Sequence, residues 1–168
     1  MKQAAVMVKT GAPLRLHSCI VLPEWVDYNG HMSESCYLLV VGDSSDAFFR
    51  CIGIDEAYRA AGHSLYTVET HLHHRREASL GDALDFTLQV LDHDSRRIHL
   101  FHQVIHAASG EVAATAEQML VHVDMAAGRT APMPGEMLER VAAIDTAHRG
   151  LPAPEGLSQP MKIRRRDT

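Results

Sequence analysis

The chain has 168 residues, of which 46% are hydrophobic, and a formal net charge of −5 from 16 Lys and Arg against 21 Asp and Glu. A single domain of this size buries roughly 70% of its unfolded surface, so it needs neither disulfides nor a structural metal to fold. The acidic balance argues against nucleic acid or an anionic membrane surface as the main partner, because both require clustered positive charge.

The cysteines and the two ends of the chain carry further predictions. Three cysteines without Cys-x-x-Cys spacing, Cys19, Cys36 and Cys51, are typical of reduced, buried thiols, so we expect a cytoplasmic protein. No apolar run reaches the roughly 18 to 20 residues of a membrane span, and residues 1–13 lack the pattern of a secretion signal. The basic run at residues 162–166 is predicted to be a solvated tail.

The first part of the chain predicts one strand followed by a long helix. Apolar residues alternate imperfectly along residues 14–22, as is typical of a strand. The residues expected on its buried face are Leu14, Leu16, Ile20 and Leu22. Ser33 offers an N-cap, after which apolar residues recur at helical spacing as far as Gly53. Because so little of this helix is polar, we expect burial on several sides, as when a sheet wraps around one central helix.

A short helix and four strands follow. Asp55 can cap a helix over residues 56–61 that ends at Gly62. The strands predicted from alternating apolar residues cover residues 65–76, 82–92, 97–106 and 112–124. Short turns make these successive strands antiparallel neighbours, so we expect four antiparallel strands. Residues 136–148 predict an exposed helix, and the proline-containing residues 151–168 a loosely held tail.

The order of these elements predicts an α+β fold, in which one long helix packs against a five-stranded antiparallel sheet. We divide the chain into an N-terminal extension (1–13), one folded domain (14–134) and a C-terminal helix with a flexible tail (135–168). A one-sided sheet leaves free strand edges and an apolar flank, which pairing between two copies covers. We therefore expect a homo-oligomer.

Asp27, Asn29 and His31 place a carboxylate, an amide and an imidazole within five residues, directly before the long helix. The N–H groups that begin that helix, around residues 33–35, form a donor pair for a developing oxyanion. A carbonyl carbon held there is polarised, and Asp27 can attack it or deprotonate a water. His31 can orient the carboxylate, relay a proton or bind the leaving group. Asp and Asn-Gly are also common in turns, so a structural role stays open.

The pattern Asp27-x-Asn29-x-His31, followed by Tyr37, resembles the motif before the central helix of hotdog-fold acyl-CoA thioesterases of the 4-hydroxybenzoyl-CoA thioesterase type. The resemblance implies a hotdog fold and hydrolysis of an acyl-CoA thioester. It also implies that Asp27 is the nucleophile or general base and that helix amides polarise the carbonyl. The related branch often continues with asparagines, whereas residues 33–34 of this chain are Ser and Glu, so the division of labour between carboxylate and imidazole stays open.

A narrower resemblance covers nearly the whole core, from about residue 14 to residue 134. The segments that carry it are Glu69-Thr70-His71-Leu72, Glu77 with Gly81-Asp82, residues 97–102 and residues 114–124. These segments are similar to thioesterases associated with carnitine and betaine breakdown, for which the proposed substrate is betainyl-CoA. The resemblance implies hydrolysis of betainyl-CoA to betaine and free CoA, with another short or medium acyl-CoA as the alternative.

Both halves of such a substrate have candidate partners. A betainyl group carries a permanent cation without hydrogen-bond donors, which aromatic faces and a carboxylate hold best. The candidate aromatic residues, each equally compatible with a place in the core, are Trp25, Tyr28, Tyr37 and Tyr66. Glu77 or Glu117 is the candidate counter-charge. For the phosphates of CoA, Arg75 and Arg76 rank first among the basic clusters, although arginines at strand ends are also common as solvated side chains.

Twelve histidines invite a metal hypothesis. Pairs such as His71 with His73, or His102 with His106, lack the spacing and the carboxylates of known metal motifs. Histidines on strand faces are usually surface groups or hydrogen-bonded interior groups. We therefore expect neither a metal nor a cofactor, and the hotdog thioesterases, which the chain resembles, need none.

Two rival functions fit the same fold. A hotdog dehydratase or hydratase acting on an acyl-CoA uses a catalytic His at a similar position, and a sensor or carrier binds the thioester without cleaving it. The complete cluster of Asp27, Asn29 and His31 favours hydrolysis over both rivals. The expected partners are an acyl-CoA and further copies of this chain, as a homodimer or homotetramer with active sites at the subunit interface.

Overall fold

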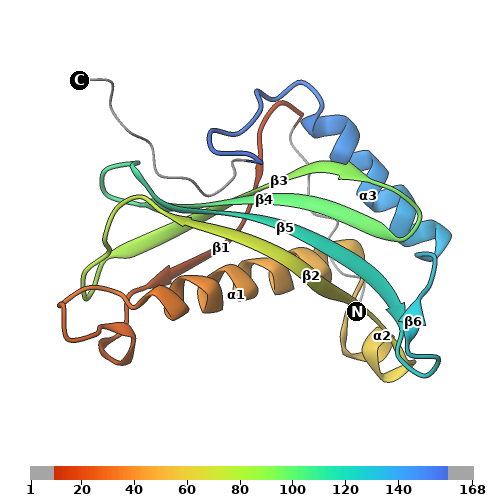
Figure 1. Cartoon of the computed structure of the whole chain (residues 1–168). Helices are drawn as coiled ribbons and strands as arrows, with labels where there is room; N and C mark the ends of the chain where they lie inside the picture. The colour runs from red at the N-terminus through yellow and green to blue at the C-terminus, as the bar shows by residue number, and fades with distance from the viewer. Residues whose placement is uncertain (1–9, 159–168) are drawn as a thin grey trace, which may run out of the picture.

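The computed structural model describes residues 10–158, in which three α-helices pack with the strands of one antiparallel sheet (Figure 1). The strands are β1 (Leu14–Ile20), β2 (His63–His74), β3 (Ala83–His93), β4 (Arg97–His106), β5 (Val112–Asp124) and β6 (Arg129–Thr130). The helices are α1 (Glu34–Ile52), α2 (Glu56–Ala60) and α3 (Gly135–His148), and none of them is long and apolar enough to cross a membrane. Every predicted strand and helix is present, which confirms the α+β class.

The strands of the sheet follow the order β1-β3-β4-β5-β2, and the two-residue strand β6 pairs with β5. The neighbours β3, β4 and β5 are antiparallel, as predicted. Strand β2 is antiparallel as predicted, but it pairs with β5 and not with its successor β3. Strands β1 and β2 are therefore the two edges of the sheet, and α1 runs along one face of it (Figure 1).

Strand β1 departs from the predicted pattern of burial. A bulge between Leu14 and His17 interrupts its pairing with β3 and shifts the alternation of side chains. Leu14 is buried, but Ile20 is 58% exposed and Leu22 is exposed as well. Cys19 packs on the core in their place. The prediction that Ile20 and Leu22 share the buried face is therefore wrong, because the bulge reverses the faces beyond it.

Helix α1 begins after its N-cap, Ser33, as predicted, and ends at Gly53, whose φ of 104° suits a residue without a side chain. Its buried residues are Tyr37, Val40, Val41, Ser44, Ser45, Phe48 and Ile52. Leu38 and Leu39 are each about half exposed. Within one chain α1 is thus buried on one face, and the prediction of burial on several sides is wrong, because the sheet covers only one side of the helix.

Apolar side chains between α1 and the inner face of the sheet form the core. Those of β3 point inward as predicted, and they are Leu84, Phe86, Leu88 and Val90. Helix α3 closes the core at the C-terminal end of α1 through Met137, Val141 and Ile144. Arg140 of α3 also donates to the Ile52 carbonyl at 3.1 Å. The prediction of an exposed C-terminal helix is therefore wrong, because one face of α3 seals that end of the core.

A buried polar network interrupts the apolar core between α1 and the sheet. His102 is fully buried, with Nδ1 3.3 Å from Ser44 Oγ and Nε2 3.4 Å from Ser45 Oγ. Ser45 also donates to Gln118 Oε1 at 2.9 Å, and Gln118 donates to Thr70 Oγ1 at 3.3 Å. Burial lowers the pKa of His102 from 6.5 to about 4, because the charged ring would lose its hydration. The imidazole is therefore neutral at pH 7.

Residues 151–158, which we call the C-terminal strap, lie against the face of the sheet that points away from α1. The strap covers outward side chains of β3 and β4, Phe101 among them, and Glu155 of the strap pairs with Arg75 at 3.0 Å. The prediction of a loosely held tail is therefore wrong for these residues, because specific polar contacts hold them. The basic run at residues 162–166 lies outside the described residues.

The three cysteines are free, as predicted, but partly rather than fully buried. Burial and the nearby Asp43 carboxylate raise the pKa of the Cys19 thiol to about 11, and burial also raises the pKa of Cys51. Thiols with raised pKa values are protonated at neutral pH and are therefore poor nucleophiles. Neither Cys19 nor Cys51 is a candidate for catalysis.

Candidate active site

The loop before α1 folds back on itself and fixes the backbone of Asp27. An isolated bridge pairs Val26 with Met32, and inside it the Asp27 N–H donates to the His31 carbonyl at 3.0 Å. Gly30 closes the turn by donating its N–H to the Asp27 carbonyl at 3.0 Å, with a φ of 79° that favours glycine. The Asp-Tyr-Asn-Gly segment is thus the tight turn of a small hairpin.

Two further bonds tie this hairpin to the rest of the protein. The Ser33 N–H donates to the Trp25 carbonyl at 2.8 Å, and the Met32 N–H donates to the Ala78 carbonyl at 2.8 Å, in the segment between β2 and β3. Trp25, Met32 and Ala78 also pack in the core around the first turns of α1. The hairpin that carries Asp27 is therefore held against both the start of α1 and the segment after β2.

The Asp27 carboxylate is partly buried, and its Oδ1 accepts the Asn29 N–H at 2.8 Å. Within residues 10–158, no hydrogen bond engages Oδ2 and none joins the carboxylate to the His31 imidazole. Asn29 and His31 are exposed, and Tyr28 is 97% exposed at the tip of the turn. Asn29 thus orients Asp27 through its backbone, and the second carboxylate oxygen remains open to a substrate or a water.

The first turn of α1 offers two backbone donors. The Ser33 N–H is already bonded to Trp25, and the Cys36 N–H donates to the Ser33 carbonyl at 3.0 Å. The N–H groups of Glu34 and Ser35 have no acceptor among the described residues. The partial positive charge of a helix start makes such donors suitable for an oxyanion. The predicted donor region, residues 33–35, therefore narrows to Glu34 and Ser35.

An open cavity of about 390 Å³ lies between the start of α1 and the segment after β2. Four predicted binding residues line it: Tyr37, Arg75, Arg76 and Glu77. The Tyr37 hydroxyl donates to the Arg76 carbonyl at 3.3 Å, and its ring meets the His74 ring edge-on, with centroids 4.9 Å apart. Burial raises the pKa of Tyr37, so its hydroxyl stays protonated. One face of α1 and the end of β2 thus build this cavity together.

Three residues that line the cavity were not among the predicted binding residues, namely Met32, Glu34 and His74. Glu34 stands three positions before Tyr37, and residues at that spacing share a helix face, so the choice of Tyr37 could have led to Glu34. His74 directly precedes Arg75 at the end of β2, so the choice of Arg75 could have led to it. No sequence signal pointed to Met32, whose place depends on its bond to Ala78.

Four predicted binding residues lie outside this cavity, and one of them is Tyr28 at the tip of the hairpin. Trp25 packs in the core, and Glu117 lies on the outer face of the sheet, where it binds the C-terminal strap. Tyr66 is 50% exposed on β2. It stands eight residues before His74, or about 26 Å at roughly 3.3 Å per residue. Within one chain, the aromatic wall of the cavity therefore reduces to Tyr37.

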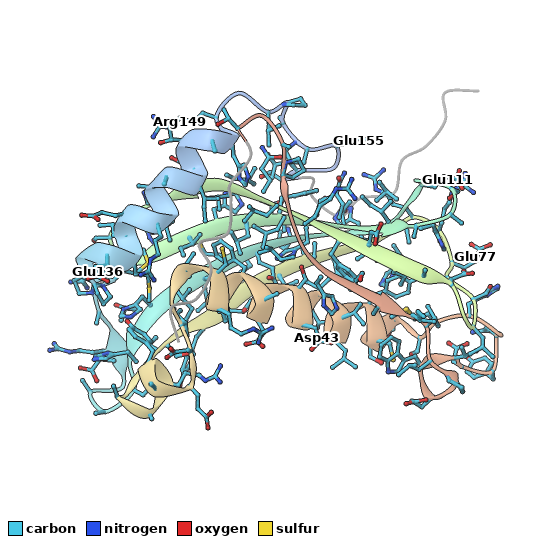
Figure 2. All side chains as sticks on the ribbon, turned by 180° about the vertical axis from the view of Figure 1, so that it is seen from behind. Asp43, Glu77, Glu111, Glu136, Arg149 and Glu155 are labelled. Carbon is cyan, nitrogen blue, oxygen red and sulfur yellow. The ribbon has the colours of Figure 1, made fainter. Side chains whose placement is uncertain are left out.

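The charges that line the cavity do not cancel. Both arginines are paired elsewhere, Arg75 with Glu155 at 3.0 Å and Arg76 with Glu111 at 2.8 Å. Glu34 and Glu77 form no ion pair among residues 10–158. Figure 2 shows Glu77 and Glu111 at the same end of the molecule. The uncompensated charge at the cavity is therefore negative.

The buried histidines serve as hydrogen-bonding groups within the fold. His122 Nε2 lies 2.6 Å from the Tyr58 hydroxyl, and His148 Nδ1 accepts the Val90 N–H at 3.0 Å. Across residues 10–158, no group of three or more His, Cys, Asp or Glu side chains is arranged to hold a metal ion.

A match to a protein-family model shows which family the chain belongs to. The model of the thioesterase-like superfamily matches residues 21–141, which include the hairpin, α1 and every residue that lines the cavity. The chain belongs to the thioesterase-like superfamily. Membership confirms the predicted family, and the long helix against one curled antiparallel sheet is the predicted hotdog fold.

Some curated relatives of this thioesterase-like chain are named for two activities, and others are named for one. The L-carnitine dehydrogenase/betainyl-CoA thioesterase of Rhizobium meliloti is 54% identical over 144 residues, which are 86% of this chain but 29% of that protein. The betainyl-CoA thioesterase of Pseudomonas aeruginosa is 46% identical over 140 residues, 83% of this chain and 88% of that protein. The chain thus spans less than a third of the first relative and most of the second.

Solved structures share the thioesterase-like architecture over nine tenths of the chain. A hypothetical protein from Staphylococcus aureus in complex with CoA has a TM-score of 0.85 and 26% identity, covering 91% of this chain and 98% of its own. A putative thioesterase from Pseudomonas putida has a TM-score of 0.80 and 30% identity over the same shares of the two chains. The likeness therefore extends well beyond the hairpin and the cavity.

Proposed function

We propose that the chain hydrolyses acyl-CoA thioesters and that its substrate is betainyl-CoA, which with water yields betaine, free CoA and a proton. The observation that carries the proposal is the hairpin that fixes Asp27, with one free carboxylate oxygen, against a helix start with two open N–H donors. The betainyl-CoA thioesterase of Pseudomonas aeruginosa, which aligns over most of its length, supports the choice of substrate.

In the proposed reaction the thioester carbonyl lies at the start of α1, where the N–H groups of Glu34 and Ser35 polarise it. Asp27 Oδ2 either attacks the carbonyl carbon, giving an anhydride that water hydrolyses, or takes a proton from the attacking water. The C–S bond breaks, and the CoA thiolate takes up a proton that His31 relays. Asn29 keeps the carboxylate oriented through its N–H.

The cavity suits the acyl end of this substrate. A quaternary ammonium cannot donate hydrogen bonds, so aromatic faces and negative charge provide its recognition. Tyr37 supplies an aromatic face, and Glu34 and Glu77 supply carboxylates without partners among the described residues. A neutral acyl group of the same shape gains nothing from those carboxylates. The proposal therefore predicts selection by charge.

The test compares betainyl-CoA with 3,3-dimethylbutanoyl-CoA, in which carbon replaces the quaternary nitrogen. We expect a kcat/KM for betainyl-CoA at least about tenfold higher, since a desolvated cation gains about 1 to 2 kcal/mol from an aromatic face. Free thiol released from each ester measures the rates. If the neutral isostere is hydrolysed as well or better, the choice of substrate is wrong and thioester hydrolysis stands. If neither ester releases thiol, hydrolysis of acyl groups of this shape is excluded, and the proposed substrate with it.

The charge of the cavity can be changed separately. Glu77→Gln is expected to lower the preference for the cationic ester about threefold or more, at the scale of a partly exposed ion pair. Glu136→Gln removes the same charge from α3, away from the cavity, and is the matched control. Equal preferences in the two variants would exclude Glu77 from recognition of the acyl group.

We further propose that two copies pair through β2. This edge strand presents Tyr66 and Val68 to solvent, and Leu38 and Leu39 are exposed on α1, which runs along the same sheet (Figure 1). Two copies of β2 in antiparallel contact extend the sheet and cover this apolar flank. A partner strand running the opposite way can also bring a Tyr66 closer to the cavity, which supports an active site at the subunit interface.

Val68→Lys is therefore expected to convert the oligomer into monomers, because it places a charge on the free edge. Ile20→Lys is the matched control, since Ile20 on the other edge is 58% exposed and Val68 59%. Sedimentation velocity measures both variants, and thiol release shows whether the monomer loses activity. Dissociation by Ile20→Lys and not by Val68→Lys would place the contact on β1 instead.

A cytoplasmic location belongs to the same proposal. It is supported by the three cysteines, which are all free. A reducing compartment keeps such thiols unpaired.

A further inference from the structure

The C-terminal strap reaches the cavity through one side chain. Arg75 lines the cavity, yet its Nη1 donates to Glu155 Oε1 at 3.0 Å and its Nη2 donates to the Glu155 carbonyl at 3.1 Å. The contact is close, because a Cβ built on Gly156 would lie 2.7 Å from Arg75 Nη2. With a φ of 93°, this glycine lets the strap pass around the guanidinium.

A second anchor holds Ser158, the last residue of the strap. Ser158 donates its N–H to Glu117 Oε2 at 2.7 Å and its hydroxyl to Oε1 at 3.1 Å. His99 Nε2 lies 2.8 Å from the same carboxylate. Although partial burial alone would raise the pKa of Glu117, the bonds from Ser158 and His99 lower it, so this anchor is charged at neutral pH. The strap is therefore held at both Glu155 and Ser158.

Arg75 keeps part of its binding capacity while the strap holds it. A guanidinium has five N–H donors, and the contacts to Glu155 use one on each terminal nitrogen. No acceptor among residues 10–158 engages its Nε–H, and the side chain is 30% exposed. The Nε–H and the N–H next to it form the edge that binds two phosphate oxygens at once.

We propose that Glu155 is a positioning residue for the CoA half of the substrate: it holds Arg75 in one orientation at the rim of the cavity, so that the free edge of the guanidinium binds a CoA phosphate. The proposal rests on the proposed function, because it places an acyl-CoA in the cavity. An arginine that is already fixed loses less conformational freedom when a phosphate binds. Glu155 acts through Arg75 and touches no reacting atom.

Glu155→Ala is therefore expected to raise KM for the acyl-CoA roughly three- to tenfold, the scale of freezing one long side chain, and to leave kcat unchanged. The same acyl group on N-acetylcysteamine, a thioester without phosphates, should show no change in KM. In an Arg75→Ala background, which raises KM by itself, adding Glu155→Ala should raise it no further. Thiol release with both substrates measures all of these values.

Glu136→Ala is the matched control. The Glu136 side chain is 88% exposed and the Glu155 side chain is 85% exposed, and each of them pairs with an arginine. Figure 2 shows Glu136 on α3, far from Glu155. This control should leave KM unchanged for both substrates. Glu155→Gln keeps an acceptor for Nη1 and should restore most of the affinity lost in Glu155→Ala.

Two results overturn the positioning role. In Glu155→Ala, a KM that stays constant or falls shows that Glu155 does not assist binding. A KM that rises equally for the acyl-CoA and for the N-acetylcysteamine ester shows a structural effect unrelated to phosphate. The proposed function survives either result as long as the unmodified protein releases thiol, and it fails only if neither thioester is hydrolysed.

Discussion

Replacing Asp27 by asparagine is expected to lower kcat for thioester hydrolysis at least about 100-fold, the lower end of what a general acid or base contributes. The fold should survive, because the new side chain has the same shape and keeps an oxygen that accepts the Asn29 N–H, now bonded at 2.8 Å. What disappears is the negative charge on the free oxygen. Thiol release measures the activity, and circular dichroism measures the fold.

Asp43→Asn provides the matched control for this prediction. Asp43 is an exposed carboxylate farther along α1 (Figure 2), and the chemical change is the same. Its kcat should equal that of the unmodified protein. Near-normal turnover in Asp27→Asn would exclude both roles proposed for Asp27, nucleophile and general base, and would direct attention to Glu34 in the cavity.

Acidification from pH 7 to pH 4 is expected to lower the free energy of unfolding by about 3 kcal/mol through His102 alone. Its pKa is about 4 in the folded protein and 6.5 when exposed, so the unfolded chain binds the extra proton first as the pH falls. The stabilisation that depends on the neutral ring is fully present above pH 6.5 and is lost progressively as the pH falls to 4. At about 1.4 kcal/mol per pH unit, this window accounts for the expected loss.

Urea unfolding at pH 7 and at pH 4 measures this loss. His102→Gln cannot take up the proton, so its unfolding free energy should fall by about 3 kcal/mol less than that of the unmodified protein. His31→Gln, at an exposed histidine, should retain the full loss. The comparison cancels contributions that the variants share, such as the lowered pKa values of His122 and His148. Equal losses in the two variants would mean that His102 is not the group responsible.

Local patterns were enough to predict where the strands and helices lie, because alternation and capping depend on neighbouring residues. They failed where distant parts of the chain decide the outcome. The bulge in β1 depends on its pairing with β3, and the buried face of α3 depends on the open end of the core beside Ile52. The strap was misjudged for the same reason, since Arg75, which holds Glu155, lies 80 residues earlier in the chain.

The same difference between local patterns and distant contacts explains why only part of the candidate site could be predicted. Asp27, Asn29 and His31 are neighbours in sequence, so their motif was visible directly. The cavity joins the start of α1 to the segment after β2, and no local pattern records which side chains meet there. Tyr37 and Glu77, which were predicted to bind the substrate, nevertheless line it. That Tyr66 lies outside it could not be predicted, because the sequence does not record that the start of α1 meets the His74 end of β2 and not the end that carries Tyr66.

The buried polar network has a consequence for the precision of the active site. Contacts between apolar side chains tolerate small sliding movements, whereas hydrogen bonds demand particular distances and angles. A shift of α1 by one turn, about 5.4 Å, would remove Ser44 and Ser45 from His102 and leave a buried imidazole without partners. The network thus fixes the position of α1 along its axis, and with it the position of the Glu34 and Ser35 N–H groups that we propose as oxyanion donors.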